Sequence, residues 1–219
     1  MSVTKKHQIL VIGHNTNGCT PEHEKIAYDV GAEIAKSNSV LITGGLGGVM
    51  TAAAHGSHDA NGLTVGIIPQ NDATMANVFC DIVIPTGMGL ARDFLNALSA
   101  DGVIIVGGGS GTLSETTAAY MYRKPIVAIR NIGGSIEPYI DGFLDHRENV
   151  KIIGADTPQE AVKKILELIT TSYDTESTDD EILDDFNKIK SGEASRMAQK
   201  NSDWHCLNYW WLDEWLSFN

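Results

Sequence analysis

Residues 103–115 decide the fold and read Val103-Ile104-Ile105-Val106-Gly107-Gly108-Gly109-Ser110-Gly111-Thr112-Leu113-Ser114-Glu115. The branched apolar residues at the start are typical of a strand that is buried on both faces of a parallel sheet. The glycines predict a tight turn, because glycine adopts positive φ angles without steric cost. The residues after the turn fit the start of a helix. The stretch therefore predicts a strand, a turn and a helix in direct succession.

This turn offers the groups that hold a phosphate. Glycines let the main chain approach an anion closely, and the free N–H groups at the positive end of a helix stabilise the negative charge. Glu115 falls about one turn into the helix, so its carboxylate can project toward the same place. The alternative is a plain strand-to-helix turn with a capping threonine. The candidate ligands of a nucleotide phosphate are Gly108, Gly109, Ser110, Gly111 and Thr112.

Short apolar runs alternate with helical patterns along most of the chain. Helix starts are indicated by Thr20-Pro21, a capping residue before a first-turn proline, and by the capping box Thr157-Pro158-Gln159-Glu160. This alternation predicts a doubly wound, mostly parallel, Rossmann-like α/β sheet, which binds ligands at the carboxyl ends of its strands. The predicted strands are Gln8–Ile12, Val40–Thr43, Leu63–Ile68, Ile82–Pro85, Gly102–Val106, Pro125–Ile129 and Lys151–Ile153.

The composition changes near Tyr173. We expect a Rossmann-like nucleotide-binding domain over residues 1–173 and an acidic linker with a C-terminal helical, Trp-rich extension over residues 174–219. The tryptophans recur at helical spacing and form one apolar stripe. Because exposed apolar stripes are costly, we expect this segment to dock on its own domain or across a homodimer, with covering of the ligand site as the alternative.

Two further elements follow predicted strands. The turn Thr43-Gly44-Gly45-Leu46-Gly47-Gly48-Val49-Met50 is a second glycine turn, with Gly44, Gly45, Gly48 and Met50 as candidate ligand contacts or as plain helix-on-strand packing. The stretch Pro85–Asp93 leads into a helix, where Arg92 can bind phosphate or ribose oxygens, or form a salt bridge with an acid such as Asp93.

Charge and cysteine content narrow the class of protein. The formal net charge is −12, which disfavours nucleic-acid binding, because that binding depends on Lys and Arg that neutralise phosphates. The three cysteines are scattered and odd in number, as in reduced thiols of a cytoplasmic protein. No stretch has the length of a membrane span. No metal site is evident, since His55 and His58 lack a third ligand.

The three motifs together resemble a known family. GGGSGTLSE resembles the PGGxGTxxE signature of the Lonely Guy family, which contains phosphoribohydrolases often mislabelled as lysine decarboxylases. GGLGGVM resembles that family's other glycine turn, and Arg92 stands where the family has its catalytic arginine. The resemblance is closer to a small branch similar to molybdenum cofactor carrier proteins, and it covers about residues 8 to 170. Two positions depart from the pattern: Gly107 replaces a proline, and Asp93 replaces the lysine of the plant-like enzymes.

The resemblance implies hydrolysis of the N-glycosidic bond of a nucleoside 5′-monophosphate to a free base and ribose 5-phosphate, with no required cofactor. Arg92 and Glu115 would be the catalytic residues: Glu115 would stabilise the oxocarbenium-like sugar and orient water, and Arg92 would hold phosphate or ribose. The glycine turns would form the nucleotide pocket. The family also suggests a homodimer or homotetramer.

Two other functions use the same motifs. The first is a non-catalytic carrier of molybdenum cofactor, whose pterin also ends in a phosphate. The second is a relative of DNA-processing protein A, whose Rossmann-like domain has features in common with the run Ala52-Ala53-Ala54-His55 before Gly62. The acidic charge argues against the second. The glycine motifs alone do not separate hydrolase from carrier.

Overall fold

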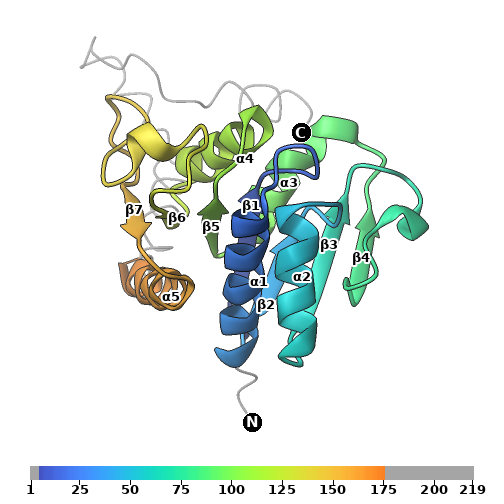
Figure 1. Cartoon of the computed structure of the whole chain (residues 1–219). Helices are drawn as coiled ribbons and strands as arrows, with labels where there is room; N and C mark the ends of the chain where they lie inside the picture. Colours follow the sequence, from blue (N-terminus) through green and yellow to red (C-terminus); the bar gives the residue numbers. More distant parts are fainter. Residues whose placement is uncertain (1–4, 176–219) are drawn as a thin grey trace, which may run out of the picture. The chain divides into compact units, whose positions relative to one another are not determined.

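The computed structural model describes residues 5–175 and forms one parallel sheet (Figure 1). Seven strands lie in the order β4-β3-β2-β1-β5-β6-β7, and every neighbouring pair is parallel. This confirms the predicted doubly wound α/β class. Of the predicted extension over residues 174–219, all but the first two residues lie outside the described residues.

The elements follow the predicted alternation. In chain order they are β1 (Gln8–Gly13), α1 (Pro21–Lys36), β2 (Val40–Thr43), α2 (Val49–Asp59), β3 (Leu63–Ile68), β4 (Ile82–Pro85), α3 (Arg92–Ser99), β5 (Gly102–Val106), α4 (Ser110–Met121), β6 (Ile126–Ile129), β7 (Ile152–Ala155) and α5 (Pro158–Thr175). The bounds of β2 to β5 are as predicted, and those of β1, β6 and β7 differ by one or two residues. Short 3₁₀ turns occupy η1 (Ala73–Met75), η2 (Gly89–Ala91) and η3 (Glu137–Tyr139). Within these residues, none of the helices combines the length and apolar character that a membrane crossing needs.

The order of the strands reverses between β4 and β5. The chain builds β1 to β4 outward in one direction, returns through α3, and builds β5 to β7 outward on the other side of β1. In such sheets, ligands bind outside the carboxyl ends of the strands at this reversal. The turn after β5 and the loop after β1 therefore lie where a ligand is expected.

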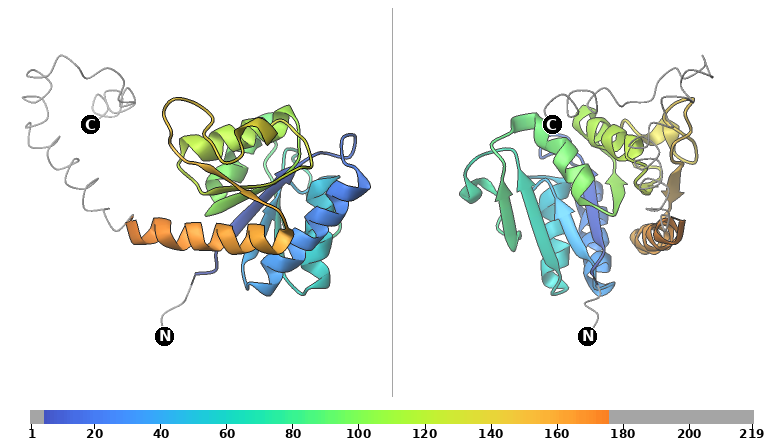
Figure 2. Two further views of the ribbon diagram at one scale, coloured as in Figure 1. Left: turned by 60° about the vertical axis from the view of Figure 1, so that its left-hand side comes forward. Right: turned by 180° about the vertical axis from the view of Figure 1, so that it is seen from behind.

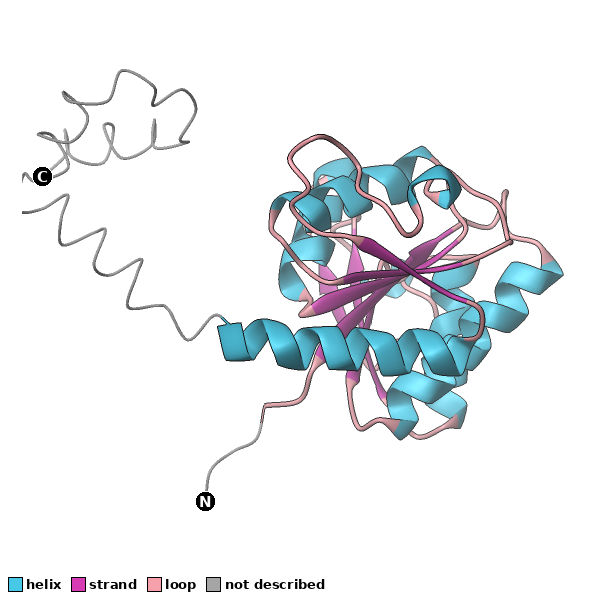
Figure 3. Cartoon of the chain, turned by 90° about the vertical axis from the view of Figure 1, so that its left-hand side faces the viewer, coloured by secondary structure: helices cyan, strands magenta, loops and turns pink. Residues whose placement is uncertain are grey.

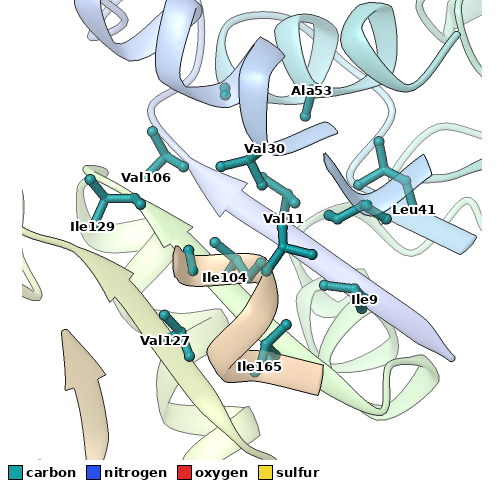
Figure 4. Packing of buried hydrophobic residues seen from close by; sticks show 14 of the residues in the cluster. Ile9, Val11, Val30, Leu41, Ala53, Ile104, Val106, Val127, Ile129 and Ile165 are labelled. Carbon is teal, nitrogen blue, oxygen red and sulfur yellow. The ribbon is translucent and has the colours of Figure 1, made fainter. Parts of the chain in front are cut away.

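The sheet is covered on both faces, which explains its continuous apolar strands. Ile9 and Val11 of β1 pack into one core with α1, α2 and α5, while Leu10 and Ile12 pack into the other with α3 and α4. Figure 4 shows the first core, where Val30 of α1 and Ile165 of α5 lie near Val11. Figures 2 and 3 show the two helical layers from other sides.

Strand β4 departs from the expectation of burial on both faces. Ile82 and Ile84 are 47% and 44% exposed. The reason is position: β4 is one of the two edge strands and pairs with β3, whereas β7 at the other edge stays mostly buried because its residues belong to the two cores. An apolar run in the sequence does not distinguish an edge strand from a central one.

Helix starts differ in how their amides are satisfied. Thr20 caps α1 in a reciprocal capping box with His23, and the Thr157 hydroxyl accepts the amide of Glu160 at 3.1 Å. By contrast, Gly109 at the start of α4 and Gly48 at the start of α2 provide no side-chain cap. The start of α3 at Ala91 also lacks a side-chain cap, and the uncapped starts of α2 and α4 follow the two predicted glycine turns.

Candidate anion and acid site

The loops after β1, β2 and β5 meet at one edge of the sheet. The Val49 amide donates to the carbonyl of His14 at 2.9 Å, which joins the start of α2 to the loop after β1. The Thr112 hydroxyl donates to the carbonyl of Gly13 at 3.0 Å, which joins α4 to the end of β1. A Cβ on Gly48 would lie 2.4 Å from the His14 carbonyl oxygen, so this approach requires glycine. The two glycine turns are therefore brought together across β1.

The turn between β5 and α4 has the backbone that its sequence predicts. Gly107 and Gly108 have φ angles of +63° and +107°. Gly109, Ser110 and Gly111 are exposed to solvent, whereas Thr112 is buried. The exposed part of the turn coincides with the uncapped start of α4. Its amides are accessible to an anion, while the hydroxyl of Thr112 is already committed to β1.

Arg92 and Glu115 are brought together, as the site prediction requires. Arg92 Nη1 lies 3.4 Å from Glu115 Oε1 and 3.0 Å from Asp93 Oδ1. Arg92 Nη2 donates to the carbonyl of Gly44 at 3.3 Å. All three residues are less than one tenth exposed. One guanidinium therefore faces two carboxyl groups in a buried place, and it is anchored to the second glycine turn.

Burial and charge imbalance change the acidity of this cluster. Burial is the main cause that raises the pKa of Glu115 from 4.5 to about 7, and the nearby Asp93 raises it further. The hydrogen bond from Asn96 and the charge of Arg92 oppose this increase. Burial also raises the pKa of Asp93, against the opposing effect of Arg92. Near neutral pH, Glu115 is therefore present in both its protonated and its ionised form.

Asn96 belongs to this cluster, although the sequence analysis did not select it. It is fully buried, and its Nδ2 donates to Glu115 Oε1 at 2.7 Å. The spacing held a signal, because Asn96 is four residues after Arg92 and so lies on the same face of α3. Within the described part of the chain, Arg92 Nε and Asn96 Oδ1 are buried without a hydrogen-bond partner. Such atoms are uncommon in folded proteins and cost stability.

The residues of the second glycine turn differ in how close they lie to the acid cluster. A Cβ on Gly44 would lie 2.6 Å from Met50 Sδ and 2.7 Å from Arg92 Nη2, so Gly44 and Met50 border the arginine. Gly45 has φ +69° and lies against Ile68 in the sheet. The structure therefore places Gly44 and Met50 beside the acid cluster, whereas Gly45 and Gly48 shape the turn.

Two histidines lie beside the glycine turn of β5. The rings of His14 and His23 have centroids 4.7 Å apart, and a Cβ on Gly107 would meet both. Desolvation, with a smaller contribution from His23, lowers the pKa of His14. Elsewhere, His55 stacks on Phe79 with centroids 4.3 Å apart.

Sequence and structure comparisons place these features among known proteins. A sequence profile described as the SLOG cluster4 family matches residues 6–162. A protein of Archaeoglobus fulgidus is 44% identical over 126 residues, which are 58% of this chain and 82% of that protein. These matches, with the solved structures below, confirm the resemblance that the three motifs indicated.

Two solved structures of similar proteins are matched over nearly their whole length. The molybdenum cofactor binding protein from the phototrophic bacterium Rippkaea orientalis is 34% identical, with a TM-score of 0.69 over 76% of this chain and 99% of that chain. The molybdenum cofactor carrier protein from Chlamydomonas reinhardtii is 30% identical, with a TM-score of 0.66 over 76% and 99%. DNA processing protein A from Helicobacter pylori, at 20% identity and a TM-score of 0.55 over 74% and 80%, is alike in fold alone.

Proposed function

Because the chain belongs to the SLOG cluster4 family, we propose that it binds a phosphate-bearing nucleotide where β1 and β5 end. The phosphate contacts are the amides of Gly108, Gly109, Ser110 and Gly111. Support comes from the exposed, uncapped start of α4 directly after glycines with positive φ angles. The oriented peptides and the positive end of the helix then favour an anion.

We further propose that Glu115 and Arg92 cleave the N-glycosidic bond of a nucleoside 5′-monophosphate. The observation that carries this proposal is the buried contact of Arg92 with Glu115, next to Asp93 and Asn96. In this reaction the bond between the sugar and the base breaks, and water adds to the sugar carbon. Protonated Glu115 gives its proton to the departing base. The resulting carboxylate stabilises the cationic sugar, orients the water and takes a proton from it as it adds.

The position of Arg92 shapes this proposal. Its Nη atoms contact Gly44, Asp93 and Glu115, so its main effect is on the charge and placement of the carboxyl groups. Phosphate binding then falls mainly to the turn of α4. Asp93 adds a negative charge where the plant-like enzymes have lysine, which favours retention of a proton in the cluster.

A second candidate function is a carrier that binds molybdenum cofactor without cleaving it. It is supported by the similarity to a molybdenum cofactor binding protein and a molybdenum cofactor carrier protein at 34% and 30% identity. The turn of α4 fits the phosphate end of the pterin as well as it fits a nucleotide. The cofactor would then be cargo, held by the same amides.

Base release separates the two functions. The protein is incubated with a panel of purine and pyrimidine nucleoside 5′-monophosphates, and free base is measured by chromatography. Hydrolysis predicts release by the natural protein and by Glu167→Gln, a substitution at an exposed site on α5, but not by Glu115→Gln. No release from any nucleotide, together with tight binding of molybdopterin, would establish the carrier instead.

We also propose that copies of the chain associate into a homodimer or homotetramer. One side of the segment η2–α3 carries Leu90, Phe94 and Leu98, which are 86%, 52% and 40% exposed. They follow one another at intervals of four residues, so they form one apolar face. A second copy that covers this face would remove it from water.

A further inference from the structure

The loop between β6 and β7 packs against the phosphate turn, at residues that no motif singled out. The Ser135 amide donates to the carbonyl of Gly108 at 2.9 Å, and the Ser135 hydroxyl donates to the carbonyl of Gly109 at 2.8 Å. Gly134 lies so close that a Cβ on it would be 2.7 Å from the carbonyl carbon of Gly107. Gly134 also has a φ of +105°. Two carbonyls of the turn are therefore fixed from outside α4.

These contacts determine where the amides of the turn point. In a planar trans peptide, the carbonyl and the N–H of the next residue point in opposite directions. A carbonyl of Gly108 that faces Ser135 thus directs the Gly109 amide away from Ser135, and the carbonyl of Gly109 does the same for the Ser110 amide. The second carbonyl is also fixed within α4, because it accepts the Leu113 amide at 3.0 Å.

The peptide between Gly108 and Gly109 has no such support from the helix. Glycine on both sides lets this peptide plane rotate at low cost. A rotated plane would present a carbonyl oxygen to the anion in place of an N–H group, which is repulsive. The amide of Ser135 opposes that rotation by holding the Gly108 carbonyl.

The loop itself is anchored, so it can act as a fixed support. His23 Nδ1 accepts a hydrogen bond from the Thr20 amide at 3.2 Å, which assigns the ring hydrogen to Nε2. Nε2 then donates to the Ile132 carbonyl at 2.9 Å. The Asn131 amide donates to Glu137 Oε1 at 2.9 Å. The support therefore connects α1, the β6–β7 loop and the turn of α4.

We propose that Gly134 and Ser135 are positioning residues of the phosphate site, which hold the Gly109 and Ser110 amides in the orientation that binds a phosphate monoester. This inference rests on the proposed function, because it assumes that the turn binds phosphate. Part of the affinity for phosphate then comes from the loop after β6, which lies outside the sequence motif.

Phosphate affinity of matched variants tests this proposal. Full-length natural protein, Ser135→Ala and Ser135→Thr are titrated calorimetrically with inorganic phosphate and with adenosine 5′-monophosphate. Loss of one hydrogen bond predicts about fivefold weaker binding to Ser135→Ala, and Ser135→Thr restores the affinity because it retains the hydroxyl. Gly134→Ala pushes a methyl group into the turn and is expected to weaken binding more than tenfold.

The control is Thr117→Ala on α4. It removes an exposed hydroxyl that donates to the Leu113 carbonyl at 2.8 Å, outside the turn. Ligand-free Ser135→Ala and Thr117→Ala should melt at similar temperatures, so that a difference in affinity reports the turn and not general stability. Because Ser135→Ala retains the main-chain amide that holds the Gly108 carbonyl, the positioning role alone would be overturned by equal phosphate affinity of the natural protein, Ser135→Ala and Gly134→Ala. Absence of binding to the natural protein would instead reject the proposed function, and this inference with it.

Discussion

Asn96 donates a hydrogen bond to Glu115 Oε1 at 2.7 Å, the same oxygen that Arg92 approaches at 3.4 Å. The amide group thus supports the ionised form of the carboxyl group without adding charge. Arg92 Nη1 contacts both Glu115 and Asp93, so its charge is shared by two carboxyl groups. The neutral hydrogen bond from Asn96 therefore matters more for the pKa of Glu115. Besides burial, the acidity of Glu115 therefore depends on Asn96 and Asp93 of α3 as well as on the arginine.

Replacement of Asn96 by leucine should raise the pKa of Glu115 above about 7, because the hydrogen bond that lowers it is removed. The measurement is a ¹³C NMR titration of the Glu115 carboxyl carbon in the full-length protein, which does not depend on activity. Thr117→Ala, at an exposed position of α4, serves as the control and should titrate as the natural protein does. A Glu115 pKa that is unchanged or lowered in Asn96→Leu would contradict this role.

Glu115 should make the protein less stable as the pH rises from about 4.5 to about 7. Its folded-state pKa is raised to about 7 from an ordinary 4.5, so the folded state binds more protons than the unfolded state in this window. The free energy of unfolding then decreases with pH, by on the order of 3 kcal/mol for this group. Urea unfolding at pH 5 and pH 8 measures the change. Glu115→Gln should reduce this dependence, whereas Glu167→Gln should retain it; equal pH dependence in both variants would contradict the prediction.

Gly44→Ala should disturb Arg92 more than it disturbs the sheet. The added Cβ would lie within 3 Å of Met50 Sδ and both Arg92 Nη atoms, so the guanidinium must shift from the position in which it contacts Glu115. We expect a loss of base release or of ligand affinity, with a cost in stability of about 1–3 kcal/mol. Gly142→Ala is the matched control, because its Cβ would be 3.5 Å from its nearest neighbour. Unchanged ligand affinity and turnover in Gly44→Ala would show that the contact of Arg92 with Gly44 is dispensable.

The apolar face of η2–α3 should carry the contact between copies. Phe94→Glu places a charge on this face and is expected to reduce the oligomer to monomers, because burial of an unpaired carboxylate is costly. Light scattering coupled to size exclusion measures the molar mass. Val78→Glu, at a residue 89% exposed before β4, is the control and should leave the mass unchanged. A natural protein that is already monomeric would rule out the interface.

The sheet could be predicted from sequence because its physical cause is local. Strands such as β5 are buried by helices on both faces, so every position in Gly102–Val106 is selected for burial. The contact of Arg92 with Glu115 was suggested by a family resemblance, and the fold brings the two residues together across 23 positions of sequence. The exposure of β4 was not predictable in this way, since it depends on the order of the strands and on which edge strand is covered by the rest of the chain.

The parts of the site that escaped prediction depend on the path of the chain. Ser135 reaches Gly108 because the β6–β7 loop packs against the turn before α4. The residue types of Gly134 and Ser135 do not predict this contact. Likewise, the Thr112 hydroxyl looked like a phosphate donor, but the packing of α4 on β1 directs it to Gly13. Asn96 was within reach of sequence reasoning, since helical spacing places it on the same face as Arg92.

Helix α3 lies at the reversal of strand order. It connects the half of the sheet formed by β1 to β4 with the half formed by β5 to β7, and it also carries Arg92. Because Arg92 also donates to the Gly44 carbonyl after β2, the carboxyl group of Glu115 is placed by segments from both halves of the sheet. A change of position between the two halves would therefore alter its acidity.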